Sequence, residues 1–289
     1  MDGVRVWSRG DTAAFFRVPG PEDDKYSRGV VALRTGSASY PGAAVLGVEG
    51  AWRAGAGFVR FIGDRQVADA VLARRPETVV GGGDAVGISA RARRSRIGAW
   101  VIGSGTDSAE RTAEDEEALR GILDGGVPVV VDAGALDLAA GAAAPVVVTP
   151  HAGEFARLQA FLDVQPRAGD GVEEALVRVA SALGAPVLLK GARTLVGTPS
   201  GEVLCVEETT SWLATAGTGD VLAGVIGAVL AANPGRSIAE GAAAGAWLHG
   251  RAGRIASGAQ CERAQTTGHP IVAMDVALAL PRAVEDVLA

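Results

Sequence analysis

The sequence predicts an α/β fold, with a central, mostly parallel sheet and helices on both of its faces. Short apolar runs rich in β-branched residues alternate with helical patterns along the chain, as at residues 127–131 and 146–148. Such runs are typical of strands that are covered on both faces, and strands of that kind pair in parallel. The chain has 289 residues, 48% of them hydrophobic, and shows no internal repeat or break in composition. We therefore expect a single domain without a separate lid.

The alternation of strands and helices begins near residue 25. Residues 30–33 predict a strand, and a helix opens near Gly42, with Pro41 in the first turn, where proline is tolerated. This helix ends at a glycine-rich segment, and a strand at 58–61 completes a βαβ unit. Further strands are predicted at 78–80, 100–102, 127–131, 146–148 and 187–189, a hairpin at the sheet edge at 194–197 and 203–206, and helices at 114–123, 173–183, 238–256 and 274–288.

Residues 1–24 predict an irregular lead-in with little structure of its own. They contain the turn-forming run Pro19, Gly20 and Pro21, which an acidic stretch follows. We expect the domain proper to span residues 25–289.

Composition excludes several classes of function. The net charge of −6 and a pI near 5.2 argue against binding to nucleic acid. No apolar run approaches the length of a membrane span, and the two cysteines, Cys205 and Cys261, do not have the spacing of a zinc site. We expect a cytoplasmic protein that does not bind membranes.

The segment that carries most chemical information is residues 214–224, in which Gly217, Thr218, Gly219 and Asp220 precede a helical apolar pattern. Glycines allow successive backbone N–H groups to converge on one point, and a helix that starts there adds the positive end of its dipole. The segment therefore predicts a phosphate-binding loop. Asp220 beside an anion fits a general base that deprotonates an attacking hydroxyl, although a simple helix cap is the alternative.

Other strand ends carry glycine or polar residues as well, and in a parallel sheet these ends share one edge. Lys190 is a candidate phosphate ligand, and Glu154 is a candidate for organising Mg²⁺ through water. Each alone has an ordinary structural explanation; their convergence predicts a cleft for phosphoryl transfer to a hydroxyl. The loops concerned are residues 36–44, 103–106, 149–154, 190–194 and 217–220, together with Asp132.

These motifs, in this order, resemble the ADP-dependent NAD(P)H-hydrate dehydratases of the ribokinase-like superfamily. The resemblance spans residues 25–282 and is carried by residues 25–29, 36–44, 53–57, 149–154, 189–194, 214–224, 249–250 and 275–281. It implies a ribokinase-like fold and ADP-dependent repair of hydrated nicotinamide cofactors, the (6S) forms of NADHX and NADPHX. In that reaction the hydroxyl on C6 of the ring attacks the terminal phosphate of ADP and then leaves as phosphate.

The resemblance also implies roles for individual residues. Asp220 is expected to act as the base, with Gly217, Thr218 and Gly219 as the anion-binding loop. The AMP part of the nucleotide is expected at Gly219 and at Lys190, Gly191, Ala192, Arg193 and Thr194. The hydrated cofactor is expected at Ala43, Ala44, Gly105, His151 and Asp220.

Two segments depart from the family pattern. Relatives often carry Asp-Ala-Asp after the central strand, and this chain has Asp132, Ala133 and Gly134. An Asn-Pro-Gly type of turn before the glycine loop is replaced by residues 210–213, which read Thr-Ser-Trp-Leu. We expect both changes to modulate the activity without removing it.

Two other functions remain open, a small-molecule kinase of the same fold and an idle nucleotide-binding protein. Relatives are often fused to an epimerase that interconverts the two hydrates, for which this chain is too short. A separate epimerase is therefore expected in the same pathway, and we expect the chain to form a homo-oligomer.

Overall fold

The computed structural model describes residues 4–81, 97–167, 169, 171–259 and 267–289. Its centre is a ten-stranded sheet in the order β1-β10-β9-β8-β7-β6-β5-β2-β3-β4. Within it, β9 is antiparallel to both of its neighbours and every other pairing is parallel. The strands are β1 (Val4–Val6), β2 (Val30–Arg34), β3 (Phe58–Ile62), β4 (Val79–Gly81), β5 (Ala99–Ile102), β6 (Val129–Val131), β7 (Val146–Val148), β8 (Val187–Leu189), β9 (Thr194–Gly197) and β10 (Val203–Val206).

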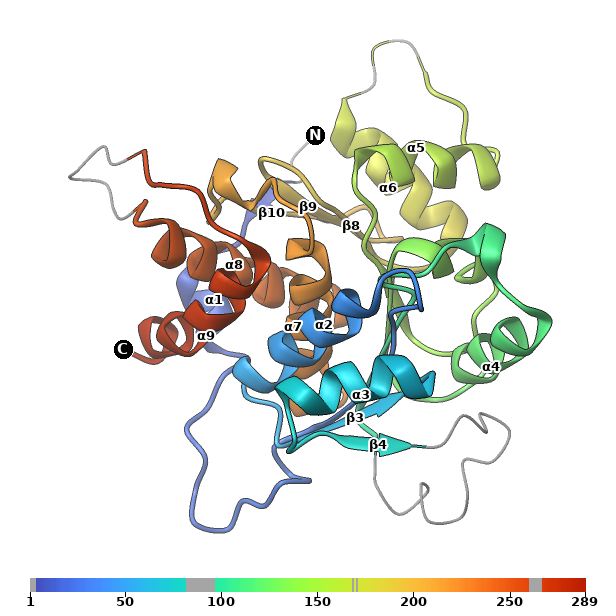
Figure 1. Cartoon of the computed structure of the whole chain (residues 1–289). Helices are drawn as coiled ribbons and strands as arrows, with labels where there is room; N and C mark the ends of the chain where they lie inside the picture. Colours follow the sequence, from blue (N-terminus) through green and yellow to red (C-terminus); the bar gives the residue numbers. More distant parts are fainter. Residues whose placement is uncertain (1–3, 82–96, 168, 170, 260–266) are drawn as a thin grey trace.

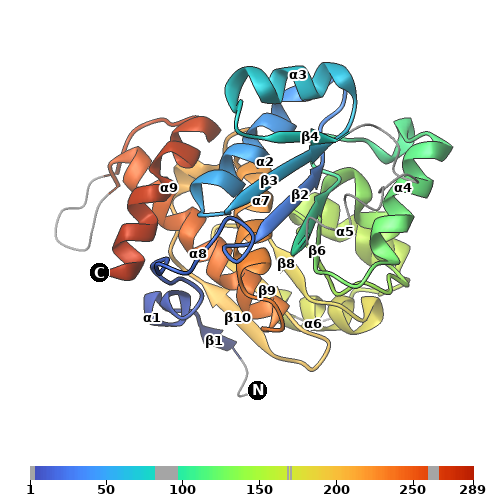
Figure 2. The ribbon, with the colours of Figure 1, turned by 90° about the horizontal axis from the view of Figure 1, so that it is seen from below.

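Helices cover both faces of this sheet (Figures 1 and 2). One apolar core joins one face to α1 (Arg9–Ala13), α2 (Pro41–Arg53), α3 (Arg65–Arg74), α7 (Thr218–Ala232), α8 (Ile238–Ser257) and α9 (Ala273–Leu288). A second core joins the other face to α4 (Ala113–Leu123), α5 (Ala152–Phe161), α6 (Val172–Leu183) and the 3-10 turn η3 (Ala133–Leu138). Two further short turns are η2 (Ser108–Glu110) and η4 (Ser211–Leu213). The predicted architecture is confirmed.

The strands form where the sequence predicts them because their residues are buried on both sides. All residues of β5, β6, β7 and β8 are buried, which matches their unbroken apolar runs. The helix predicted near Gly42 begins at Pro41, in its first turn. Two helices that the periodicity leaves unassigned, α1 and α3, are short and polar along much of their length.

The prediction of an irregular lead-in is wrong for residues 4–16. β1 pairs in parallel with β10, and α1 begins after Ser8, whose side chain and that of Asp11 form a reciprocal cap. Trp7 and Phe15 are buried in the core, and the indole N–H donates to Thr12 Oγ1 at 2.9 Å. Two buried aromatic rings anchor this segment, and pattern reasoning misses it because its elements are only three and five residues long.

The hairpin predicted from residues 194–206 is present, but it does not lie at the edge of the sheet. β9 and β10 pair in antiparallel register, and β1 adds outside β10. This placement follows from the lead-in, whose strand the sequence pattern does not reveal. In Figure 2, β1 lies beside β10 at one end of the sheet.

The central helix of the fold is α7, which the helical apolar pattern after residue 220 predicts. It is buried over most of its length and packs against α2, α8 and the strands β2 and β5. Glycines bring α2 and α7 into backbone contact: a Cβ at Gly224 would lie 2.0 Å from the carbonyl oxygen of Gly47. The loop that precedes α7 is thus fixed to the most buried part of the molecule.

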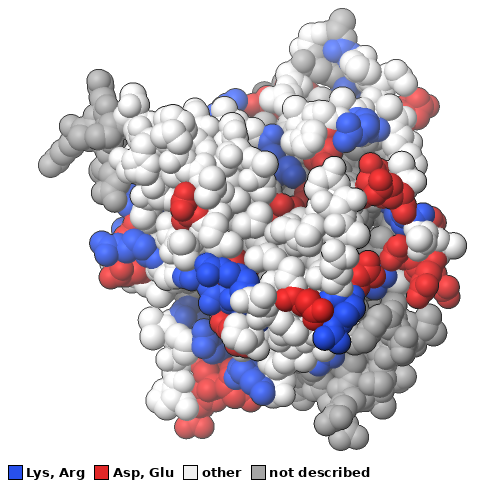
Figure 3. Space-filling model, viewed as in Figure 1, with Lys and Arg blue, Asp and Glu red and all other residues white. Residues whose placement is uncertain are grey.

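In the described part of the chain, no helix is long and apolar enough to cross a membrane. On the face seen in Figure 3, basic and acidic side chains are interspersed. Cys205 is buried in β10, and Cys261 lies outside the described residues.

Candidate active site

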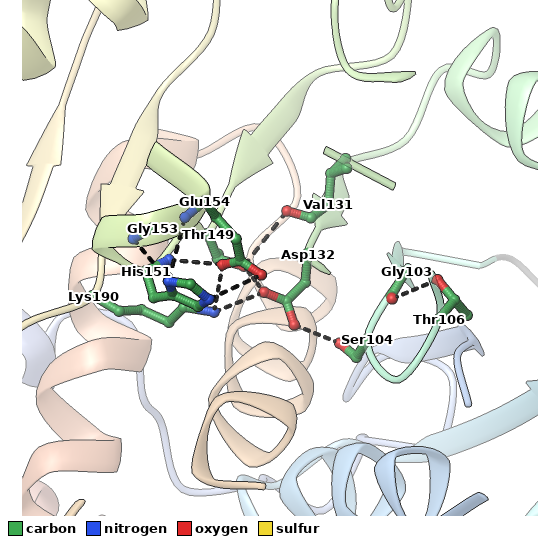
Figure 4. Close-up of polar contacts among 10 residues, drawn as sticks. All are labelled: Gly103, Ser104, Thr106, Val131, Asp132, Thr149, His151, Gly153, Glu154 and Lys190. Atoms are coloured by element: carbon green, nitrogen blue, oxygen red, sulfur yellow. Dashed lines mark hydrogen bonds and ion pairs between the residues drawn. The ribbon is translucent and has the colours of Figure 1, made fainter. Parts of the chain in front are cut away.

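Four neighbouring strands each deliver one polar side chain to the same point (Figure 4). Ser104 follows β5, Asp132 follows β6, Thr149 follows β7 and Lys190 follows β8. Because these strands are adjacent and parallel, their carboxyl ends meet at one edge. The sequence prediction that polar strand ends converge is confirmed for this group.

Asp132 is the centre of the group, and both of its carboxylate oxygens are engaged. The Ser104 hydroxyl donates to Oδ2 at 2.8 Å, and the Thr149 hydroxyl donates to Oδ1 at 2.7 Å. Lys190 Nζ donates to Oδ1 at 2.9 Å. Asp132 is only 3% exposed, so these bonds replace the water that its charge would otherwise require.

The ammonium group of Lys190 faces the glycine loop. A Cβ built on Gly219 would lie 3.5 Å from Lys190 Nζ, an ordinary contact distance, so the ammonium lies next to the first turn of α7. Glu154 Oε2 lies 3.8 Å from the same nitrogen. Burial disfavours the charged amine, but the carboxylates of Asp132 and Glu154 outweigh it and raise the pKa of Lys190 above its ordinary value.

The glycine loop forms as predicted, with one difference. Gly217 has φ of 89°, the left-handed conformation that favours glycine, and it caps α7. The helix begins within the motif expected to precede it, at Thr218, whose hydroxyl donates to the carbonyls of Leu213 at 2.8 Å and Thr215 at 3.0 Å. Gly219 therefore lies inside the first turn of the helix.

Asp220 lies in the first turn of α7, and within the described residues its carboxyl has no hydrogen-bond partner. Burial and, to a smaller extent, the charge of Asp132 raise its pKa to about 6, while Lys190 acts in the opposite direction. A carboxylate of this kind suits a general base, because it binds a proton more readily than an exposed aspartate. This environment favours the role predicted for Asp220 over that of a simple helix cap.

His151 and Glu154 cap α5 in a reciprocal arrangement. The Nδ1 atom of His151 accepts from the N–H groups of Gly153 at 3.0 Å and Glu154 at 3.3 Å, and Glu154 Oε2 accepts from the His151 N–H at 2.8 Å. Because Nδ1 is an acceptor, Nε2 carries the proton of the neutral ring, and this nitrogen lies 3.6 Å from Glu154 Oε1. The capping explanation of Glu154 is therefore correct, and it coexists with contact to Lys190.

A cavity of about 1000 Å³ adjoins these residues. Gly105, His151 and Glu154 line it, as do Tyr40 and Arg157. Ala43 and Gly105 are in close contact, since a Cβ on Gly105 would lie 2.3 Å from that of Ala43. The cavity lining does not include Ala43, Ala44, Asp220 or Lys190, and Ala44 is fully buried beneath Gly36.

Of the six residues expected at the nucleotide, the five at 190–194 do not all lie at the strand-end site. Lys190 lies there, whereas the side chain of Arg193 is 3.4 Å from Glu173 of α6. Gly191 and Ala192 are exposed in the turn between β8 and β9, and Thr194 begins β9. Of these residues, Gly191 and Ala192 are open to a ligand from solvent.

Both departures from the family pattern have a structural counterpart. A Cβ on Gly134 would lie 2.3 Å from the carbonyl oxygen of Thr106, so a second carboxylate there would require that loop to move. Residues 210–213 include the turn η4, whose Trp212 indole donates to the carbonyl of Thr267 at 2.7 Å. Through Leu213, this turn supports Thr218 and hence the glycine loop.

Sequence reasoning assigns no role to two residues that the structure places at the site. In the sequence, Asp132 is marked only by its position directly after a predicted strand. His249 of α8 is 7% exposed, lies against the backbone of Thr218, and its Nε2 has no hydrogen-bond partner among the described residues. A histidine within an otherwise alanine- and glycine-rich helix is the signal that marks it.

The strand order and the helices on both faces of the sheet define the fold as ribokinase-like. A ribokinase-like superfamily protein from Enterococcus faecalis superposes with a TM-score of 0.82 at 23% identity, covering 99% of this chain and 97% of that one. The family model described as NAD(P)H-hydrate dehydratase matches residues 31–269. The chain belongs to the NAD(P)H-hydrate dehydratase family.

Individual relatives agree with this assignment. The ADP-dependent (S)-NAD(P)H-hydrate dehydratase of Neisseria meningitidis is 36% identical over 83% of this chain and 81% of its own length. The bifunctional NAD(P)H-hydrate repair enzyme of Mycobacterium tuberculosis is 45% identical over 76% of this chain, which matches only 45% of that protein. The ADP/ATP-dependent NAD(P)H-hydrate dehydratase of Bacillus subtilis, co-crystallised with ATP and Mg²⁺, superposes with a TM-score of 0.80 at 26% identity over 99% of each chain.

Proposed function

We propose that the chain catalyses ADP-dependent dehydration of the (6S) hydrates of NADH and NADPH. The observation that carries the proposal is the arrangement of Asp220, with its raised pKa, in the first turn of α7 behind the anion loop and beside Lys190. A base at the positive end of a helix dipole, next to a cation, suits deprotonation of a hydroxyl that attacks phosphorus. Membership of the dehydratase family supports the choice of substrate.

The proposed reaction divides into phosphoryl transfer and elimination. Asp220 takes the proton from the C6 hydroxyl, whose oxygen forms a bond to the terminal phosphorus of ADP while AMP leaves. The C6–O bond then breaks, phosphate leaves, and the lone pair of the ring nitrogen and the loss of a C5 proton restore the dihydronicotinamide. The N–H groups at the start of α7 and the Lys190 ammonium stabilise the charge on the phosphoryl oxygens.

A magnesium ion is proposed as part of the nucleotide complex. No group of three or more His, Cys, Asp or Glu residues that the structure describes is arranged to hold a metal ion. Mg²⁺ is commonly bound through phosphates and waters with one or two carboxylates, and Glu154 at the cavity fits that role through water. When bound, the ion would neutralise phosphate charge.

Substrate contacts are proposed at Ala43, Gly105 and His151, and nucleotide contacts at residues 190–194 and Gly219. The cavity beside His151 and the contact of Gly105 with Ala43 support the first set, and the approach of Lys190 to Gly219 supports the second. Ala44 is buried, so we propose that it supports the loop from beneath. An epimerase partner, a homo-oligomer and a cytoplasmic location remain predictions.

The test is absorbance at 340 nm of the purified protein with (6S)-NADHX, Mg²⁺ and either ADP or ATP. We expect an ADP-dependent rise that Asp220→Asn abolishes and that Asp124→Asn, an exposed carboxylate at the end of α4, leaves unchanged. Protein that is folded and binds ADP but gives no rise with either nucleotide would contradict the proposal. The small-molecule kinase would then become the leading alternative.

A further inference from the structure

The carboxylate of Asp132 accepts three side-chain hydrogen bonds, and none of them stabilises the turn that follows it. Its carboxylate receives hydroxyl donors from the strands on either side, Ser104 after β5 and Thr149 after β7, and the ammonium of Lys190 from the next strand beyond. As the N-cap of η3 it makes no side-chain capping bond. The side chain is thus directed across the strand ends toward Lys190 and not back to its own turn.

Lys190 is in turn held at two points. Its backbone N–H donates to the carbonyl of Pro150 at 2.9 Å, which fixes the start of the side chain, and Asp132 holds the other end. A lysine side chain has four rotatable bonds, and an unrestrained ammonium would sample many positions. With both ends fixed, Nζ lies where a Cβ of Gly219 would contact it.

We propose that Asp132 is a positioning residue, which holds the Lys190 ammonium over the first turn of α7, where the nucleotide phosphate binds in the proposed function. Asp132 does not itself contact the phosphate. Ser104 and Thr149 fix the carboxylate, the carboxylate fixes the ammonium, and the ammonium meets the anion. The inference rests on nucleotide binding at this loop and does not depend on which hydroxyl is phosphorylated.

Positioning of Lys190 by Asp132 and repulsion of phosphate by Asp132 predict different effects of an Asp132 substitution on ADP binding. Removing the charge of Asp132 relieves its repulsion of phosphate, which would tighten ADP binding whether or not Lys190 is present. Loss of positioning weakens ADP binding only when Lys190 is present. A double-mutant cycle separates these two effects.

The experiment is calorimetric titration of ADP with Mg²⁺ into four proteins: the unaltered chain, Asp132→Asn, Lys190→Met and the double variant. Asparagine has the size of aspartate and can still bond to both hydroxyls. We expect Asp132→Asn to weaken ADP binding about tenfold in the unaltered background, the cost of one bond to a charged group. In the Lys190→Met background we expect no weakening. An equal change in both backgrounds, of either sign, would overturn the proposal.

The cycle does not measure turnover, so its outcome is separate from that of the absorbance test. If the unaltered chain binds ADP and gives no rise at 340 nm, the dehydratase proposal fails and the cycle still decides the role of Asp132. If the unaltered chain does not bind ADP, both proposals fail together.

A second measurement does not require Lys190→Met, which leaves a buried carboxylate without its cation and is expected to be unstable. Ser104→Ala and Thr149→Val each remove one donor to Asp132 and leave the Asp132–Lys190 pair in place. Ser200→Ala, an exposed hydroxyl in the turn after β9, is the matched control. We expect the first two to weaken ADP binding by a few-fold and the control to have no effect. ADP affinity that is unchanged in both Ser104→Ala and Thr149→Val would overturn the proposal.

Discussion

The imidazole of His249 lies against the backbone of Thr218, in the first turn of α7, and its Nε2 is buried without a partner among the described residues. The histidine and the glycine loop come from different helices, α8 and α7, which pack together. The ring is uncharged at neutral pH, because burial and the charge of Lys190 lower the pKa of His249 to about 4, against the opposing effect of a hydrogen bond with the Thr218 backbone.

This environment predicts that folding stability falls in mild acid. Between pH 6.5 and 4 the unfolded chain binds a proton at His249 that the folded chain does not bind, so the free energy of unfolding decreases as pH falls through this range. The loss is on the order of 3 kcal/mol. Urea unfolding of His249→Gln between pH 4.5 and 7.5 should lack this contribution, whereas His269→Gln, an exposed histidine, should retain it. Identical pH dependence in the two variants would contradict the assignment.

The activity should depend on pH through Asp220. With its pKa raised to about 6, the carboxyl is deprotonated at neutral pH and becomes protonated below pH 6, where it cannot accept the hydroxyl proton. We expect kcat/KM to fall about tenfold for each pH unit below 6. Initial rates over pH 4.5–8 test this, and an acid limb near pH 4 would show that Asp220 is not perturbed in solution.

Asp132 also influences this acid limb. Asp132 and Lys190 are the charged groups that shift the pKa of Asp220, in opposite directions. Asp132→Asn removes a negative charge whose effect on the pKa of Asp220 is larger than that of Lys190, so we expect the limb to move to lower pH even when the ammonium is released. The pH profile of Asp132→Asn would show this, and a limb that does not move would contradict the prediction.

The buried carboxylate of Asp220 should lower the free energy of unfolding at neutral pH, for the same reason that its pKa is raised. Its pKa in the folded chain is higher than in the unfolded chain, so folding becomes less favourable as pH rises from 4 to 6 and the full cost applies above pH 6. Asp220→Asn should therefore raise the melting temperature at pH 7 by a few degrees and leave it unchanged at pH 4. A lower melting temperature at pH 7 would show that the charged carboxylate is stabilised in the fold.

The contact between α2 and α7 should tolerate no added side chain. A Cβ at Gly224 would lie 2.0 Å from the carbonyl oxygen of Gly47, and backbone atoms on both sides prevent its accommodation. We expect Gly224→Ala to lower the free energy of unfolding by at least about 2 kcal/mol. Gly121→Ala is the matched control, because Gly121 lies in α4 with nothing within 4 Å of an added Cβ. It should stabilise the chain by up to about 1 kcal/mol, as measured by urea unfolding.

Sequence patterns predict the central strands of this fold well, because a strand that is buried on both faces consists of apolar residues without interruption. The runs that form β6, β7 and β8 contain only apolar residues, and all of these residues are buried. The segment of β1 and α1 was missed because tertiary pairing to β10 and two aromatic rings, not local periodicity, hold it in place.

The site was predicted in outline and not in detail. Strand order decides which polar ends become neighbours, and single-sequence patterns contain no strand order. Asp132 and Lys190 are far apart in the sequence and form an ion pair because β6 and β8 flank β7. His249 was missed for the same reason, since its importance depends on how α8 packs on α7.

The pairing of β1 with β10 has a consequence for biosynthesis. Val4 lies opposite Val203, so β1 finds its partner only after the nearly 200 intervening residues have been synthesised. During that interval Trp7 and Phe15 have no core to enter, because the helix α8, which packs on α1, is made later still. The segment of β1 and α1 therefore docks late, and the nascent chain carries exposed aromatic rings until it does.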